Sequence, residues 1–176
     1  MLNGRLPPRG DVVRIALIHA VYAGGWALVS LAAGGVSPAP AVALLLFAVA
    51  LVVGVVRQLR RRAAVPAMDA DLTRWVRRVN IVTALAALLY GWALSGVGQE
   101  GKAVAAVLVI LGLHFLPMWL LLRRASLLAI GVALVADGMW VWHAPGLAAS
   151  GAFAAALVFA GNGVRLALRT EREERA

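Results

Sequence analysis

Long apolar runs separated by short polar segments are the main pattern along the chain. Six runs have about the 20 residues that a helix needs to cross the hydrocarbon core of a bilayer. Residues 41–56 carry no polar side chain, whereas a strand of a transmembrane barrel would alternate apolar and polar residues. We therefore predict an all-α bundle of six transmembrane helices that forms one membrane domain over residues 1–176. The predicted spans are 12–34, 39–57, 76–97, 102–122, 125–143 and 147–168.

The composition agrees with this class of protein and excludes several others. Hydrophobic residues make up 62% of the 176 residues and charged residues 14%, whereas soluble domains carry about 25% charged residues. The net charge of +9 would suit nucleic acid, but so apolar a chain offers no charged face with interleaved aromatic residues, so nucleic acid is excluded as a partner. The absence of cysteine excludes disulfides, thiolate metal sites and cysteine nucleophiles.

Basic residues fall almost entirely on one side of the predicted membrane. If the N-terminus is cytoplasmic, all sixteen arginines lie on the cytoplasmic side and only Lys102 lies opposite. Lys and Arg near helix ends resist translocation and therefore accumulate in the cytoplasm. We predict a multi-pass protein with both termini in the cytoplasm.

The longest connection between spans, residues 57–78, begins and ends with basic residues. Arginines there suit anionic lipid headgroups, with about 1 kcal/mol for each near the surface, and a tryptophan suits the headgroup level. We predict contact with membrane lipid; the alternative is that the topology rule alone accounts for the charges. The predicted lipid-interface residues are Arg60, Arg61, Arg62, Trp75, Arg77 and Arg78.

Glycine recurs at corresponding places in the spans. It accompanies tryptophan in the outer halves of the odd spans, at Gly25, Gly91 and Gly138, and precedes basic residues in the inner halves of the even spans. This repeat predicts three tandem helical hairpins that each enter and leave on the cytoplasmic side. The alternative is that glycine and tryptophan, at 18 and 6 residues, are simply frequent.

The arrangement resembles the bacterial HdeD-like family of small six-span membrane proteins, which has three hairpins, glycines in the spans and basic residues after each even helix. Residues 112–118 are also similar to a segment of uncharacterised six-span bacterial proteins. The resemblance implies an inner (plasma) membrane protein with a link to stress, and it implies no activity, ligand or catalytic residue. His114, Pro117 and Asp137 depart from the HdeD-like pattern.

Polar residues inside the spans are the candidates for chemistry, because an ionisable side chain in hydrocarbon costs at least about 2.5 kcal/mol and usually faces the bundle interior. Asp137 lies in the fifth span, and His114 lies in the fourth, three residues before a proline that removes a backbone hydrogen bond. Asn162 lies between two glycines in the sixth span. Asp137 is the strongest candidate because an acid has little structural use there.

Two helical stripes add to these candidates. His19, Tyr22, Trp26 and Ser30 recur at helical spacing in the first span, and Asn80, Thr83 and Tyr90 share a face of the third. If both faces turn inward, they line a proton or ligand path. The alternatives are packing, an interfacial position or a hydrogen bond between helices. The candidate path residues are Asp137, His114, Asn162, Tyr90, His19 and Tyr22.

Catalytic and metal-binding motifs are missing from the sequence. It has no His-Glu-x-x-His, no Gly-x-Ser-x-Gly and no phosphate loop. His143 would need two further metal ligands, and only Glu100 lies near its level. We therefore predict no metal and no cofactor. An enzyme would depend on Asp137 with His114 as acid and base, at depths that differ by roughly 8 Å, so an enzyme is disfavoured.

Three hypotheses of function follow. The first is a small-solute or proton-linked transporter or channel with its polar site around Asp137. The alternative is a structural or accessory subunit of a membrane complex, in which the polar groups join helices. The third is an intramembrane enzyme that modifies a lipid or isoprenoid. Small residues at four-residue spacing, such as Ala16-Ala20-Gly24 and Ala148-Ala152-Ala156-Ala160, predict close helix packing and leave room for a homo-oligomer.

Overall fold

The computed structural model describes residues 9–34, 37–61, 70–122 and 125–175. This part of the chain folds into six long helices and one short 3₁₀ turn, without a β-strand. The helices are α1 (Arg9–Ala33), α2 (Pro38–Arg61), α3 (Ala70–Gly96), α4 (Glu100–Leu122), α5 (Ala125–His143) and α6 (Ala148–Arg175), and the 3₁₀ turn η1 (Pro145–Leu147) precedes α6.

Each of the six helices contains a segment long and apolar enough to cross a membrane. These segments are Ile15–Ala33, Pro38–Arg57, Arg74–Gly96, Glu100–Leu120, Ala125–His143 and Pro145–Leu168. The predicted fold class is therefore confirmed, and the predicted span limits agree within three residues. Helix α4 continues through Pro117 as one helix, so the polar residues at its middle lie on an unbroken element.

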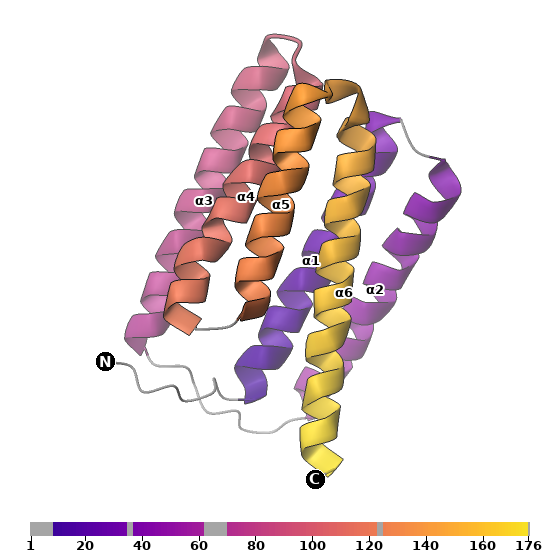
Figure 1. Ribbon diagram of the computed structural model, residues 1–176. Coiled ribbons are helices and arrows are strands. Elements are labelled where there is room, and N and C mark those ends of the chain that lie inside the picture. The colour runs from indigo at the N-terminus through magenta and orange to yellow at the C-terminus, as the bar shows by residue number, and fades with distance from the viewer. Residues whose placement is uncertain (1–8, 35–36, 62–69, 123–124, 176) are drawn as a thin grey trace.

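The helices run alternately up and down, and α1 begins at the same end of the bundle at which α6 ends (Figure 1). We call this the terminal end, and we call the opposite end, where η1 joins α5 to α6, the η1 end. The side of the membrane on which each end lies stays a prediction, as does the kind of membrane.

Two groups of three helices form the bundle. The most extensive contacts join α1 to α6 and α4 to α5, while α2 packs on α1 and α3 packs on α4. The groups α1–α2–α6 and α3–α4–α5 meet where α6 contacts α5 and α4, and this boundary is called the seam. Because the closest packing joins helices from different predicted hairpins, the arrangement as three tandem hairpins stays a prediction.

Glycines set the close approach of α4 to α5. A Cβ atom at Gly112 would lie 2.8 Å from the carbonyl oxygen of Gly131, and one at Gly138 would lie 2.8 Å from that of Ala105. Small residues drive such association in membranes because the apolar side chains gain little by leaving lipid, whereas close backbones gain van der Waals contact. The seven-residue spacing of Gly131 and Gly138 therefore brings the same face of α5 onto α4 twice.

Alanine faces play the corresponding role between α1 and α6. The predicted small-residue ridges lie inside the bundle, and their buried members include Ala16, Ala20, Ala148, Ala152, Ala156 and Ala160. Near the η1 end, the buried Ser30 hydroxyl donates a hydrogen bond of 2.9 Å to the carbonyl oxygen of Ala149. Three members of the predicted α1 stripe, His19, Trp26 and Ser30, are buried.

We expect Ser30→Ala to lower the free energy of unfolding by about 1 kcal/mol, because it removes a buried hydrogen bond between helices without changing their shape. Equilibrium unfolding in mixed detergent micelles measures the loss. Ser150→Ala is the matched control, since Ser150 is an exposed serine on α6, the helix that accepts the Ser30 bond, and this variant should unfold like the wild type. An equal loss in both variants would contradict a specific role for the Ser30 bond.

Helix α3 is the most exposed of the six. Its backbone packs against α4 alone among the described helices, and residues such as Leu88 and Trp92 lie exposed on its surface. At its start, Trp75, Arg77 and Arg78 are exposed, as lipid-facing residues would be. Arg74 forms an ion pair with Asp71 one turn away. The predicted lipid contacts of Arg60 and Arg61 concern side chains outside the described set, and Arg62 lies outside the described residues.

Candidate functional site

Asp137 lies in the seam, on the face of α5 that meets α6 near the η1 end. Its Oδ1 atom is 3.2 Å from the position that a Cβ would take at Gly151, so the missing side chain of Gly151 leaves room for the carboxylate. The Oδ2 atom is buried and has no hydrogen-bond partner among the described residues. The surroundings are apolar, since Val141 and Leu108 also lie beside Gly151.

His19 lies in α1 toward the terminal end and is 3% exposed. Its Nδ1 atom donates a hydrogen bond of 2.7 Å to the carbonyl oxygen of Ile15. A carbonyl can only accept, so this bond places the ring hydrogen on Nδ1 and leaves a lone pair on Nε2. In the described structure the Nε2 atom is buried without a hydrogen-bond partner.

Asn162 lies close to His19 on the neighbouring helix. It is 8% exposed, and its Nδ2 atom is also buried without a described hydrogen-bond partner. The next residue, Gly163, packs directly on α1, because a Cβ there would lie 3.6 Å from the Cβ of His19 and 3.5 Å from the carbonyl oxygen of Ala16. His19 and Asn162 therefore lie within about one helical turn of the same level.

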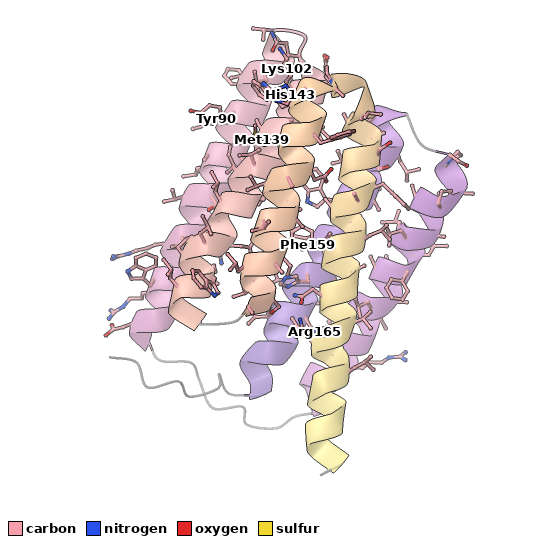
Figure 2. All side chains as sticks on the ribbon, in the orientation of Figure 1. Tyr90, Lys102, Met139, His143, Phe159 and Arg165 are labelled. Atoms are coloured by element: carbon pink, nitrogen blue, oxygen red, sulfur yellow. The ribbon has the colours of Figure 1, made fainter. Side chains whose placement is uncertain are left out.

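Aromatic rings fill the seam between this level and Asp137. The ring centroid of Phe159 is 5.5 Å from that of His19, 5.2 Å from that of Tyr22 and 6.0 Å from that of Phe115. Phe159 comes from α6 and Phe115 from α4, so their side chains bridge the two helix groups near the middle of the bundle, where Figure 2 shows Phe159. We call Phe115, Phe159 and Tyr22 the aromatic layer; Tyr22 forms its outer edge, because it is 41% exposed and stacks on Phe159 from within its own helix group.

His114 and Tyr90 lie away from this part of the seam. The Nδ1 atom of His114 shares a hydrogen bond of 3.0 Å with the hydroxyl of Thr83, so His114 is turned toward α3. Tyr90 is 61% exposed and points away from the bundle (Figure 2), because α3 has one neighbour and a side chain of this size extends beyond the contact. Of the predicted polar stripe of α3, Thr83 is the member that reaches another helix.

Asp137 and His114 do not form an acid and base pair. Where α5 meets α4, Gly138 lies between Ala105 and Val109, and Gly112 lies between Gly131 and Val135. This register places Asp137 roughly 9 Å nearer to the η1 end than His114, and the two side chains face α6 and α3 respectively. Acid–base catalysis needs both groups within hydrogen-bond reach of one substrate, so the geometry disfavours the enzyme hypothesis.

The η1 end carries a small polar surface group. The ammonium of Lys102 lies 5.6 Å from the centre of the Trp142 ring, a distance typical of a cation–π contact. His143 is exposed beside it (Figure 2). Because these side chains lie on the surface, they anchor the end of the bundle and take no part in the buried seam.

The seam contains residues that sequence reasoning missed, namely Gly151, Phe115 and Phe159. Each resembles many other residues of an apolar helix. The one signal available was nearness in sequence to a polar candidate. Phe115 follows His114 directly, and Phe159 precedes Asn162 by three residues, which is nearly one turn.

No known protein family, curated protein or solved structure matches this chain. The resemblance to the HdeD-like family stays a prediction, and the function is argued from the residues themselves.

Proposed function

We propose that the protein transports a small cation, the proton included, along the seam between its two helix groups. The half-buried carboxylate of Asp137 carries this proposal, since its Oδ2 atom is buried and has no described hydrogen-bond partner. A carboxylate that joined helices would be expected to pair, because an unsatisfied buried polar group costs about 1–3 kcal/mol. A group that binds a passing solute needs the free atom instead.

The position of the other unpaired groups supports the same path. The buried side-chain atoms without a hydrogen-bond partner in the described structure belong to Asp137, His19 and Asn162. These residues lie beside α6 or on it, at both ends of the aromatic layer. Unpaired polar atoms gathered along one boundary favour a solute path over scattered packing defects.

The way in which the two groups meet also supports transport. The described contacts of Asp137 and Val141 with Gly151 join α5 to α6 near the η1 end, and the helices draw apart toward the terminal end (Figure 1). At the terminal end the two helix groups meet through the rings of His19 and Phe115, while the backbones of α1 and α4 do not approach closely. Rotation of two rings can open such a boundary with little disturbance of helix packing.

The charge of the site selects the class of solute. Asp137 is the acidic residue that lies away from the ends of the described spans, and the described basic residues of the spans lie toward their ends. A single acid within the bundle attracts cations and repels anions. We place the terminal end in the cytoplasm, because Arg57, Arg77 and Arg78 lie at that end of their helices.

The test is cation flux into liposomes that contain the full-length protein. Ion-sensitive dyes follow the uptake of H⁺, Na⁺ and K⁺ by wild type and by Asp137→Asn, which keeps the shape of the side chain and removes its charge. We expect the flux of Asp137→Asn to fall to that of empty vesicles. Glu100→Gln is the matched control, because it makes the same chemical change at an exposed acid, and it should keep the wild-type flux.

Equal flux in wild type and Asp137→Asn would overturn the proposal. Wild-type protein without flux of any of the three ions would also overturn it and would favour the accessory-subunit hypothesis. Thermal unfolding of each variant shows whether a lost flux reflects a lost fold.

A further inference from the structure

His19 and Asn162 offer complementary groups at the terminal end of the seam. The Nε2 atom of His19 holds a lone pair that can accept a hydrogen, and the Nδ2 atom of Asn162 carries hydrogens that it can donate. Both atoms are buried and unpaired in the described structure. Water can satisfy both kinds of atom, because it donates a hydrogen to Nε2 and accepts one from Nδ2.

We propose that the transported solute is the proton, and that His19 binds and releases it at the terminal end of the seam. The proton is transferred from a hydronium ion in the seam to the lone pair of Nε2, which forms one N–H bond and leaves water. The same bond breaks when a water molecule on the terminal side takes the proton. Asn162, within about one helical turn of the same level, offers its Nδ2 hydrogens to the water of this exchange. This assignment rests on the proposed transport function.

The position of His19 suits this exchange. It lies four residues, or roughly 6 Å of helix, inside the start of the apolar span of α1 at Ile15. A short step therefore separates Nε2 from the membrane surface at the terminal end. The opposite side of the His19 ring meets the rings of Phe159 and Phe115, whose centroids lie 5.5 and 6.2 Å away.

The aromatic layer favours a proton over a larger cation. The rings of Phe115 and Phe159 lie at contact distance, and neither carries a polar atom that could replace the water of a hydrated ion. Twelve residues of α6 separate Gly151, beside Asp137, from Gly163, beside His19, which corresponds to about 18 Å. Polar atoms so far apart cannot together replace the hydration shell of a metal cation, whereas a proton needs one acceptor at a time.

The described contacts of His19 include no charged group that would stabilise its protonated form. Its described contacts are the Ile15 carbonyl on α1, Phe115 on α4, and Phe159 and Gly163 on α6. These groups are uncharged, and Arg165, a nearby cation on α6, is exposed. Protonation of His19 therefore has no ionic partner to hold it, so that the proton can be released again.

The test compares two histidines of the same protein in liposomes. A potassium diffusion potential drives uptake, and a pH-sensitive dye inside the vesicles reports proton flux while a second dye reports Na⁺. We expect wild type to carry protons without Na⁺, and His19→Gln to lower the proton flux by about 100-fold, as loss of a proton-transferring side chain does. His114→Gln is the matched control and should retain the wild-type flux. Asn162→Leu should lower the flux while leaving His19 in place.

The outcomes separate this inference from the transport function itself. Unchanged proton flux in His19→Gln would overturn the role of His19. Flux of Na⁺ or K⁺ that depends on Asp137, without proton flux, would leave the transport proposal standing and overturn the assignment of the proton. Loss of all flux in wild type would overturn both.

A measurement on the unmodified protein guards against a variant that fails to fold. Nitrogen-15 NMR of labelled histidine distinguishes a ring nitrogen that carries hydrogen from one that does not. We expect Nδ1 of His19 to carry hydrogen and Nε2 to gain it on acidification, with the His114 signals identified from His114→Gln. A bare Nε2 throughout the pH range of the flux would overturn the inference.

Discussion

Phe159→Ala should lower the free energy of unfolding by about 3 kcal/mol, near the low end of the cost of removing a buried phenylalanine ring. Phe159 is fully buried and contacts rings on α1 and α4. Because lipid is as apolar as the bundle interior, the loss comes chiefly from the cavity and the broken contacts rather than from transfer out of water. Equilibrium unfolding in mixed micelles measures it.

The same variant should raise the resting cation leak of liposomes, because a cavity replaces the central ring of the aromatic layer. Phe47→Ala is the matched control, since Phe47 on α2 is 46% exposed and its loss leaves the seam intact. Phe159→Leu should fall between Phe159→Ala and wild type in both measurements. If Phe159→Ala and Phe47→Ala had the same free energy of unfolding and the same cation leak, Phe159 would not be the residue that closes the seam.

Gly112→Ala combined with Gly138→Ala should destabilise the bundle by about 3 kcal/mol, the upper part of the range for overpacking. Each added methyl group would lie within 3.0 Å of backbone atoms of the neighbouring helix. Backbone cannot move aside as a flexible side chain can, so α4 and α5 would have to separate along much of their length. Thermal unfolding, with circular dichroism to confirm that the helices remain, measures the effect.

Gly25→Ala combined with Gly161→Ala is the control for this pair. Both glycines are helical, and no atom of another element lies within 4 Å of the Cβ position at either of them. Alanine forms helix more readily than glycine, by up to about 1 kcal/mol, so the control should be as stable as wild type or more stable. A similar loss in both double variants would show that close packing of α4 on α5 is not the cause.

The spans could be predicted from the sequence because membrane insertion is a local property. A run of about 20 apolar residues satisfies the bilayer whatever its neighbours are, and for this reason the predicted limits lie within three residues of those of the apolar segments of the helices. The shared face of His19, Trp26 and Ser30 was predictable from helical spacing in the same way. The direction of a face was not, because Tyr22 of the same stripe is 41% exposed and Tyr90 of the α3 stripe is 61% exposed.

The partners of each helix were not predictable in this way. In lipid, an apolar face is equally stable against acyl chains and against another helix, so sequence pattern does not say which faces are buried. The Ala16-Ala20 ridge of α1 and the Ala87-Gly91 ridge of α3 look alike. The first is buried against α6, whereas the second covers a strip on α4 and leaves Tyr90 exposed.

The site shows the same division. Asp137 and Asn162 stood out as polar residues in apolar runs, and the structure leaves both with a buried unpaired atom. The separation of His114 from Asp137 was indicated by depth alone, and the opposite directions of the two side chains depend on which helix each one meets. Gly151 and Phe159 could not be identified in advance, because their importance comes from a neighbour across the seam.

The pairing of α1 with α6 joins two helices that leave the ribosome with four other spans between them. When α1 enters the bilayer, its small-residue face must remain against acyl chains, since its principal partner is synthesised after four other spans. The α4–α5 contact can form sooner, between consecutive spans. Assembly of these six spans therefore begins with neighbours and finishes with the contact of α1 and α6, and arrest of synthesis before α6 would leave His19 without the ring of Phe159.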